Sequence, residues 1–381
     1  MRQGGQQTRD ATWMREAVSL ARRGEGYTRP NPPVGAVIVR GDALIARGYH
    51  ARAGGPHAEI SAIRKAGPLA RGSTLYVTLE PCSSKGRTGP CTEAIVAAGI
   101  SRVVVGSRDP NPQHKGRGLR RLRQAGIEVV SGTERATTDP LVRPFQKWVT
   151  TGRSFVTLKL AITWDGRIAD RNGRSKWITG TAARARVQRL RRQADVIMVG
   201  VDTVIADDPL LTSRDRTSQP LRRLVLDSHG RMPLGARMLH DGQEGQTIVA
   251  TTAACPLSRR AKLRETGATV WVLPTLGGRV SLKALVRKLG GDGMLHVLCE
   301  GGGRLAGTLI KADCVDELRL FVAPRVLGRS GVSAVEASGW TLSAAPAFEF
   351  VEAEKLGDDL SVVAIPRRRA ARAGDARRRK G

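Results

Sequence analysis

Four side chains suited to metal-assisted hydrolysis lie between positions 57 and 91: His57, Glu59, Cys82 and Cys91. Catalytic zinc sites use three protein ligands and leave the fourth position to water. One imidazole and two thiolates supply that number, and the two thiolates offset the charge of the metal. Glu59 follows His57 by two residues, so at the start of a helix it would face the water and transfer its proton. The pattern predicts a zinc-dependent hydrolytic site.

The elements expected around these residues place them at strand–helix junctions. A helix over residues 57–66 begins after a Gly-Gly-Pro turn, a strand over 75–79 leads to Cys82, and a helix begins near Thr92 beside Cys91. A lone His-x-Glu is common by chance, and a lone cysteine is usually a small core residue. The combination at these junctions favours zinc. Cysteines 255, 299 and 314 lack ligand spacing and are expected to be structural.

A second candidate site follows an apolar strand predicted over residues 295–299. Three glycines, Gly301 to Gly303, separate this strand from a helix predicted over 305–312. Glycines at the start of a helix let a phosphate approach the backbone N–H groups. Glycine also serves ordinary turns, and the spacing is not the G-x-G-x-x-G of a Rossmann fold. The sequence alone therefore leaves both interpretations open.

The chain as a whole alternates predicted helices and strands, which is typical of α/β proteins. Residues 1–8 are polar and expected to be frayed, the pattern pauses over 142–153, and a new strand begins at Phe155. No apolar run approaches the ~18–20 residues of a membrane span, and the first residues lack a secretory signal. An odd number of cysteines, five in 381 residues, favours a reduced, cytoplasmic compartment.

The formal charge of +29 admits nucleic acid or phosphorylated small molecules as partners. The last sixteen residues carry eight basic residues and one Asp, a net of +7, and are expected to be a disordered tail. Aromatic residues are only 4% of the chain, which argues against a single-stranded nucleic-acid platform built on stacking.

The first half of the chain resembles the bifunctional deaminase–reductase of bacterial riboflavin biosynthesis. The resemblance rests on Pro30-Asn31-Pro32-Pro33-Val34-Gly35, Gly48-Tyr49-His50, Pro56-His57-Ala58-Glu59, Thr78-Leu79-Glu80-Pro81-Cys82-Ser83, Gly86-Arg87-Thr88 and Asp109-Pro110-Asn111-Pro112. It implies zinc ligands at His57, Cys82 and Cys91, a proton donor at Glu59, and substrate contacts from Asn31, His50 and Arg87. Ser84 stands where the family usually has a histidine, and Lys85 follows as a substitute cation.

The second half resembles the NADPH-dependent reductase domain of the same family. The resemblance rests on the stretches 159–169, 175–180, 206–212 and 226–228. It implies cofactor contacts from Ala161, Trp177, Thr203, Asp207, Ser228, Gly302, Gly303, Arg304, Leu305, Ala306, Gly307 and Thr308. It also implies substrate contacts from Ser175, Arg191, Leu211, Arg214 and Glu300, with Arg191 and Arg214 as clamps for a phosphorylated sugar.

The resemblance implies a cytidine-deaminase-like three-layer α/β/α domain over residues 8–150 and a dihydrofolate-reductase-like α/β domain over 154–366, followed by the tail at 367–381. It implies zinc-dependent deamination of a phosphoribosylamino-diaminopyrimidinone to the uracil, then reduction of the ribosyl to a ribityl chain with NADPH. The partner would be a phosphorylated pyrimidine, and no membrane or nucleic-acid partner is expected. A homo-oligomer is possible on this interpretation. The alternatives are a nucleoside or nucleic-acid deaminase with an accessory domain, a paralogue with one activity, and a binding module anchored by the tail.

Overall fold

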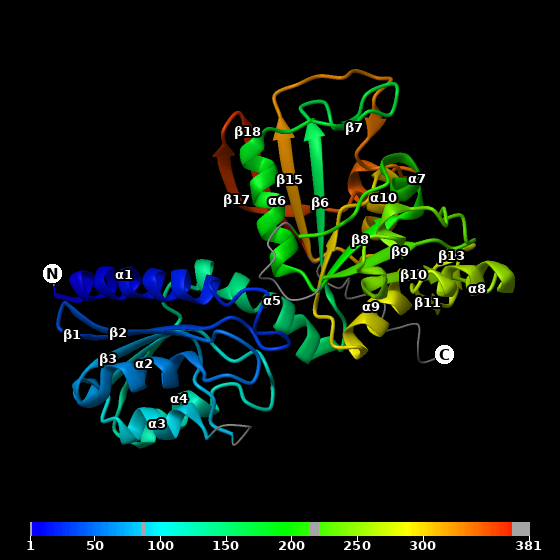
Figure 1. Ribbon diagram of the computed structural model, residues 1–381. Helices are drawn as coiled ribbons and strands as arrows, with labels where there is room; N and C mark the ends of the chain where they lie inside the picture. The colour runs from blue at the N-terminus through cyan, green and yellow to red at the C-terminus, as the bar shows by residue number, and fades with distance from the viewer. Residues whose placement is uncertain (1, 85–88, 214–220, 368–381) are drawn as a thin grey trace, which may run out of the picture.

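The computed structural model describes residues 2–84, 89–213 and 221–367, which fold around two separate β-sheets (Figure 1). The N-terminal part, through residue 151, surrounds a five-stranded sheet, and the C-terminal part, from residue 155, surrounds a nine-stranded sheet. Positions 85–88, 214–220 and 368–381, which include Lys85, Arg87, Arg214 and nearly all of the basic tail, lie outside the described residues.

The first sheet has the order β2-β1-β3-β4-β5. Its strands are β1 (Gly35–Arg40), β2 (Ala43–Tyr49), β3 (Thr74–Leu79), β4 (Arg102–Ser107) and β5 (Glu128–Ser131). β1 pairs antiparallel with β2 and β3, whereas β3, β4 and β5 are parallel. The carboxyl ends of β3 and β4 therefore lie at one edge, where parallel sheets usually present ligand-binding loops.

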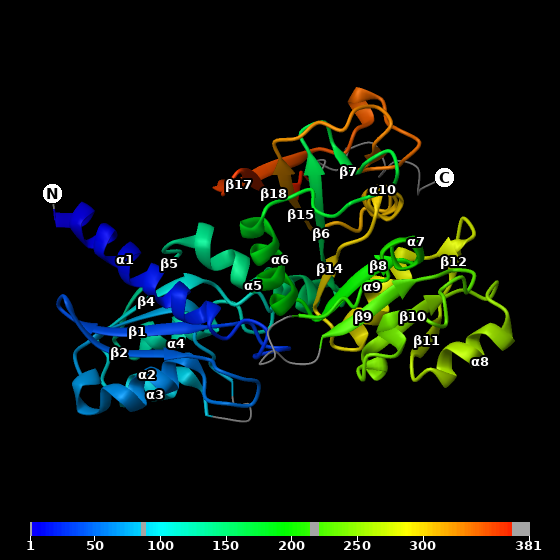
Figure 2. The ribbon, with the colours of Figure 1, turned by 45° about the horizontal axis from the view of Figure 1, so that its top comes forward.

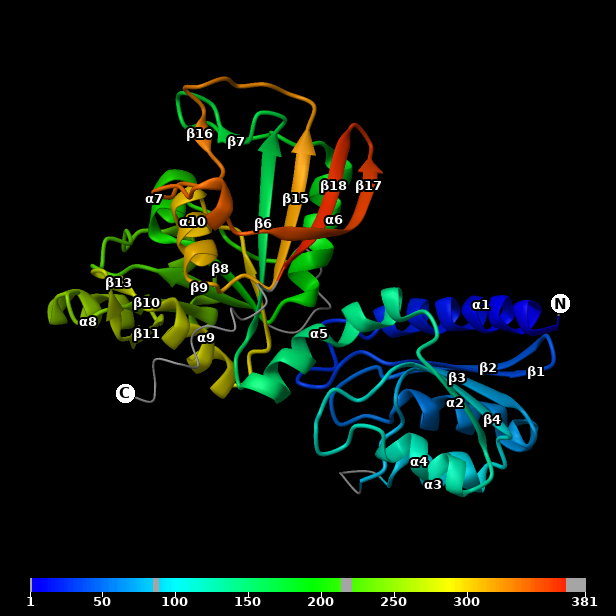
Figure 3. The ribbon, with the colours of Figure 1, turned by 180° about the vertical axis from the view of Figure 1, so that it is seen from behind.

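Helices cover both faces of this sheet (Figures 1 and 3). They are α1 (Arg2–Arg22), α2 (Ala58–Ala66), the 3-10 turn η1 (Gly67–Ala70), α3 (Cys91–Ala97), α4 (Arg117–Gln124) and α5 (Arg135–Thr151). Met14 of α1 packs on Val37 and Tyr76, on one face of the sheet. Ala62 of α2 and Ile95 of α3 pack on the opposite face. The alternation of buried strand residues produces the expected three-layer α/β/α arrangement.

The second sheet has the order β11-β10-β9-β8-β14-β6-β15-β18-β17. Its strands are β6 (Phe155–Thr163), β8 (Val196–Gly200), β9 (Arg222–Leu226), β10 (Thr247–Thr251), β11 (Thr269–Val272), β14 (His296–Cys299), β15 (Glu317–Ala323), β17 (Phe348–Leu356) and β18 (Asp359–Pro366). The strands from β11 to β15 are parallel, and β18 and β17 extend the sheet antiparallel. Two short ribbons join it: β7 (Arg167–Ala169) with β16 (Val332–Ser333), and β12 (Thr275–Leu276) with β13 (Arg279–Val280).

Helices and short 3-10 turns cover the second sheet (Figure 2). The elements are α6 (Thr181–Gln193), α7 (Val201–Asp207), η2 (Arg237–Leu239), η3 (Glu244–Gln246), α8 (Leu257–Glu265), α9 (Leu282–Gly291), α10 (Gly303–Lys311) and η4 (Leu342–Ala344). Leu285 of α9 and Leu309 of α10 pack on one face, against Val297. Leu190 of α6 packs on the other face, against Leu298. The predicted α/β class is confirmed for both halves.

The N-terminal segment differs from the sequence-based expectation, because residues 2–8 belong to α1 rather than to a frayed end. Gln6 donates a 2.9 Å hydrogen bond to Asp10, one turn later, and Arg102 and Tyr76 also bind the Asp10 carboxylate. These contacts are polar, and the residues that make them show no periodic spacing of apolar side chains. Hydrophobic periodicity therefore does not predict this part of the helix.

The pause expected over residues 142–153 is also wrong, because residues 142–151 form the second half of α5. Pro140 and Pro144 lie inside the helix, and prolines weaken helix prediction by removing backbone donors. Leu141 and Val142 pack against α1, so burial offsets the lost hydrogen bonds. α5 ends at Thr151, immediately before β6, and it contacts both parts of the chain.

Candidate functional site

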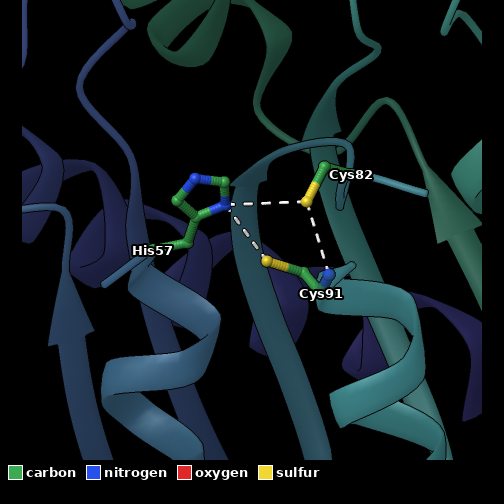
Figure 4. Close-up of side chains that lie close together, drawn as sticks. All are labelled: His57, Cys82 and Cys91. Carbon is green, nitrogen blue, oxygen red and sulfur yellow. Dashed lines mark hydrogen bonds between the residues drawn. The ribbon is translucent and has the colours of Figure 1, made fainter. Parts of the chain in front are cut away.

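Three potential metal ligands converge between α2 and α3 (Figure 4). Nδ1 of His57 lies 3.2 Å from Sγ of Cys91 and 3.6 Å from Sγ of Cys82, and the three ligand atoms lie within 4.8 Å of one another. Zinc bonds of about 2.0–2.1 Å to nitrogen and 2.3 Å to sulfur place tetrahedral ligand atoms ~3.6 Å apart. Both the donor set and the spacing fit zinc.

Local structure explains why these side chains meet. His57 is the residue before α2 with extended backbone, and Cys91 is the first residue of α3. Cys82 lies in the loop after β3, where its sulfur accepts a 3.3 Å hydrogen bond from the Cys91 backbone N–H. The partial positive charge at the beginning of a helix stabilises a nearby thiolate.

The electrostatics of the cluster suit a bound cation and a proton carrier. The hydrogen bond between the cysteine side chains holds the pKa of Cys82 well below its usual value and raises the pKa of Cys91. A bound cation would favour the thiolate form of both sulfurs. Glu59 is 4% exposed, and burial raises the pKa of its carboxyl group. A raised pKa suits a carboxyl group that must both accept and release a proton.

His50 lies beside the metal ligands, as the sequence predicted. Its ring centroid is 5.5 Å from that of His57, and its Nδ1 lies 3.0 Å from the carbonyl oxygen of Pro56. Burial lowers the pKa of His50, so the ring is neutral, with Nδ1 donating to Pro56. Its buried Nε2 has no hydrogen-bond partner among the described residues. That lone pair can accept a hydrogen bond from a substrate amine or amide.

Asn31 lies on the loop before β1, and its backbone carbonyl oxygen accepts a 2.9 Å hydrogen bond from the Thr28 hydroxyl. The residue is exposed and lines a cavity of about 660 Å³ between the N-terminal and C-terminal parts. The structure therefore brings Asn31 to the cavity between the two parts of the chain. Arg87 lies outside the described residues, so its predicted substrate contact stays a prediction.

Glu80 is a positioning residue to which the sequence analysis assigned no role. Its buried carboxylate accepts hydrogen bonds from the backbone N–H groups of Asp109, Gly116 and Gly118, at 3.0–3.1 Å. These bonds join the end of β3 to the beginning of α4. A Cβ at Gly118 would lie 2.1 Å from the carbonyl oxygen of Pro81, so α4 packs directly on the residue before Cys82. Glu80 thereby holds the loop that carries this ligand.

In the C-terminal part, four of the predicted cofactor residues lie at one edge of the sheet. Thr203 follows β8, Ser228 follows β9, and Gly302 follows β14. Because these strands are parallel to one another and to β6, which carries Ala161, their carboxyl ends share this edge. Ligands bind at this edge of open α/β sheets.

The glycines around α10 have two different roles. A Cβ at Gly302 would meet no atom within 4 Å, so the backbone is open to a ligand at the beginning of the helix. At Gly303 and Gly307 a Cβ would lie 2.2 and 2.1 Å from the carbonyl oxygens of Ser333 and Glu336. These two glycines allow close packing of α10 against the 333–337 segment. The spacing of glycines in the sequence does not show whether a glycine is needed for such packing or for phosphate binding.

The remaining predicted residues of α10 differ in accessibility. Ala306 is fully buried in the core, and Leu305 packs against that core. Arg304 forms an exposed ion pair with Glu336, at 3.3 Å, and the Thr308 hydroxyl donates to the Arg304 carbonyl at 2.7 Å. The side chains of Arg304 and Thr308 thus face outward, whereas Ala306 is turned away from any ligand.

Arg191, Glu300 and Lys159 form a charged cluster. The Arg191 guanidinium binds the Glu300 carboxylate with both Nε and Nη2, and Nη1 donates to the carbonyl oxygen of Thr212 at 2.9 Å. Burial raises the pKa of Glu300, but Arg191 and Lys159 outweigh it and hold the pKa below its usual value. Burial also lowers the pKa of Lys159. Lys159 was not predicted as a site residue, although a lysine inside a largely apolar strand is a signal that could have identified it.

The other predicted residues that the structure describes lie on connections, except for Asp207 at the end of α7. Trp177 is exposed, and the Arg184 guanidinium lies over its ring, 4.8 Å from the ring centroid. Ser175 is partly buried on the same segment. Leu211 is buried, whereas Asp207 is exposed at the end of α7. Arg214, the second predicted clamp, lies outside the described residues.

Two family models match the chain. The model described as cytidine and deoxycytidylate deaminase zinc-binding region matches residues 7–107, and the RibD C-terminal domain model matches residues 154–362. The riboflavin biosynthesis protein RibD of Aquifex aeolicus is 41% identical over 355 residues, 93% of this chain and 97% of that protein. The protein of the same name from Escherichia coli is 42% identical over 367 residues, 92% of this chain and 98% of that one.

Solved structures agree with these sequence matches. Acinetobacter baumannii RibD has a TM-score of 0.82 at 38% identity and covers 95% of this chain and all of its own. A Thermotoga maritima protein described as a diaminohydroxyphosphoribosylaminopyrimidine deaminase and 5-amino-6-(5-phosphoribosylamino)uracil reductase has a TM-score of 0.81 at 34% identity, with the same coverage. The chain therefore belongs to the RibD family of riboflavin biosynthesis enzymes, with a zinc-binding deaminase region followed by an NADPH-dependent reductase region.

Proposed function

We propose that the N-terminal part hydrolyses the amino group of 2,5-diamino-6-(5-phosphoribosylamino)pyrimidin-4(3H)-one, and that the C-terminal part reduces the resulting uracil to its ribityl form. The observation that carries this proposal is the convergence of His57, Cys82 and Cys91 beside the buried Glu59. The name of the Thermotoga maritima relative supports the choice of pyrimidine.

For deamination, His57, Cys82 and Cys91 would hold zinc, which supplies the Lewis acidity that makes water a nucleophile near neutral pH. Glu59 takes up a proton at its carboxylate oxygen and returns it to the ring nitrogen or to the amine that leaves as ammonia. His50 accepts a hydrogen bond from the pyrimidine at Nε2, because its Nδ1 is already engaged with Pro56. Glu80 keeps the Cys82 loop in place throughout.

For reduction, NADPH would lie across the edge defined by Ala161, Thr203, Ser228 and Gly302, and it supplies the hydride. Lys159 and Glu300 present opposite charges to the opened ribose beside that edge. Arg191 orients the Glu300 carboxylate and the Thr212 backbone through its three hydrogen bonds. The protein thus acts mainly by orienting the substrate and the cofactor, because the cofactor itself supplies the chemistry of hydride transfer.

The direct test supplies the purified chain with the diaminopyrimidinone phosphate, with and without NADPH, and follows ammonia and NADPH separately. Ammonia release without NADPH, followed by NADPH consumption, supports both activities. NADPH consumption without ammonia release contradicts the proposed order. A chain that releases ammonia but never consumes NADPH supports instead the paralogue with one activity.

The partners follow from the same chemistry. The substrate is a small phosphorylated pyrimidine, and the scarcity of aromatic residues argues against nucleic acid. All five cysteines are free thiols, which supports a cytoplasmic location. In the part of the chain that the structure describes, no helix has the length and apolar character to cross a membrane. The exposed edge strand β17, with Phe350 73% exposed, supports self-association.

A further inference from the structure

Arg29, on a loop of the N-terminal part, contacts the end of a helix in the C-terminal part. Its Nε lies 2.8 Å from Oδ1 of Asp195, and both side chains are less than one-fifth exposed. Its Nη2 donates to the carbonyl oxygen of Arg192, at 2.9 Å, and to that of Ala194. One guanidinium therefore binds three acceptors within the four residues that follow Arg191.

The two carbonyl groups belong to the last turn of α6, which ends at Gln193 and has Ala194 as its C-terminal cap. The last carbonyls of a helix have no partner within it, and arginine is favourable there because of the helix dipole. Arg29 therefore acts as the cap that α6 lacks in its own sequence.

Neighbouring residues fix the same contact. The Gln193 amide donates to the Glu25 carboxylate at 2.7 Å. Gly26 adopts a positive φ of 84°, and a Cβ there would lie 2.3 Å from the carbonyl oxygen of Arg192. The loop and the end of α6 are thus packed backbone to backbone, with no room for a side chain between them.

The same turn of α6 carries Arg191, whose guanidinium orients Glu300. A second connection runs through Asp195, whose other carboxylate oxygen accepts 2.8 and 2.7 Å hydrogen bonds from Leu295 and His296, where β14 begins. β14 ends one residue before Glu300. Arg29 thus contacts the end of α6 directly and is connected to the beginning of β14 through Asp195.

We infer that Arg29 is a positioning residue for the reductase site, so that a loop of the deaminase part sets the geometry of the Arg191–Glu300 pair. The inference rests on the proposed role of this pair in binding the uracil substrate. The Arg29 loop continues directly into Pro30 and Asn31, which line the cavity between the two parts. The docking of the deaminase part against α6 therefore affects the position of Arg191 and Glu300 without adding a residue to the reductase site.

The test uses the full chain and supplies 5-amino-6-(5-phosphoribosylamino)uracil directly, so that reduction does not depend on prior deamination. Arg29→Met keeps the aliphatic stem and removes every donor; the KM for the uracil should rise roughly three- to tenfold with a smaller change in kcat. Arg29→Lys keeps the charge beside Asp195 but loses the fork, and should restore part of the loss. Ammonia release from the diaminopyrimidinone should stay unchanged in both variants.

Lys147→Met is the matched control, because Lys147 of α5 forms a 2.5 Å ion pair with Asp316 across the same two parts without touching α6. It should lower the unfolding temperature and leave the KM for the uracil unchanged. An unchanged KM in folded Arg29→Met, or an equal rise in Lys147→Met, contradicts the inference. If Arg29→Met does not fold, an unaltered KM in Arg29→Lys overturns it. A wild-type chain without NADPH consumption contradicts the proposed function instead.

Discussion

Arg191 and Glu300 form a two-pronged ion pair, with Nε to Oε1 at 2.7 Å and Nη2 to Oε2 at 3.1 Å. The pair is largely buried, with side chains 18% and 9% exposed. The sequence analysis interpreted Arg191 as a clamp for the substrate phosphate. Three of its five N–H donors bind Glu300 and the Thr212 carbonyl oxygen, so Arg191 orients these groups in the structure. The contact with the substrate phosphate stays a prediction.

Replacing Arg191 should therefore impair reduction alone. Arg191→Ala leaves a buried carboxylate without its partner, so the KM for the uracil should rise by about tenfold or more. Arg191→Lys keeps the charge but not the two-pronged geometry and should recover little. Arg189→Ala, at an exposed position two residues earlier, is the control and should behave as wild type. Ammonia release impaired together with NADPH consumption in Arg191→Ala would contradict the separation of the two sites.

Zinc content should depend on Cys82 but not on the cysteines that lie outside the His57–Cys82–Cys91 cluster. Outer-shell changes commonly weaken a metal site about 10- to 100-fold, and loss of a direct ligand should exceed this. Cys82→Ser should therefore be purified with little zinc and release no ammonia, as measured by elemental mass spectrometry and an ammonia assay. Cys314→Ser, at a buried position outside the cluster, should keep its zinc. Full zinc in Cys82→Ser would overturn the ligand assignment.

The Asp10 anchor of α1 should make stability depend on pH. Burial raises the pKa of Asp10, but hydrogen bonds from Arg102, Tyr76 and Gln6 outweigh it and lower the pKa below its ordinary 3.8. The carboxylate therefore stabilises the fold fully above that value, and the contribution is lost as the pH falls through the lowered pKa.

Asp10→Asn should lower the free energy of unfolding by about 1–3 kcal/mol near neutral pH. Urea unfolding at a series of pH values measures the difference from wild type. The difference should be constant from neutral pH to about pH 5 and shrink below the ordinary pKa of a carboxyl group. A difference that persists unchanged at the lowest pH would show that the Asp10 charge is not the stabilising feature.

The zinc site was predictable because each ligand stands beside a local signal: His57 after a Gly-Gly-Pro turn, Cys82 after a strand, and Cys91 at the start of a helix. The spatial role of Glu80 was not predictable. Its partners, Gly116 and Gly118, are far along the chain, and no local pattern shows that a carboxylate will bind their N–H groups.

In the C-terminal part, the resemblance placed Ala161, Thr203, Ser228 and Gly302 at positions that the parallel strands bring to one edge. The sequence could not separate Gly302 from Gly303 and Gly307, because close packing and ligand approach both require glycine. β17 was not predicted, because both of its faces are mostly exposed. Its sequence therefore lacks the alternation of apolar and polar residues that marks a strand with one buried face. The contacts of Arg29 depend on the docking of the two parts and leave no trace in local sequence.

The central claim is that one chain carries two independent chemistries, and Glu59→Gln tests it most directly. The variant should keep its zinc and lose ammonia release by about 10²–10⁴-fold, because the amide cannot take up the proton. Supplied with the uracil, it should consume NADPH at the wild-type rate. Retained ammonia release, or loss of NADPH consumption in the folded, zinc-loaded variant, would contradict the account.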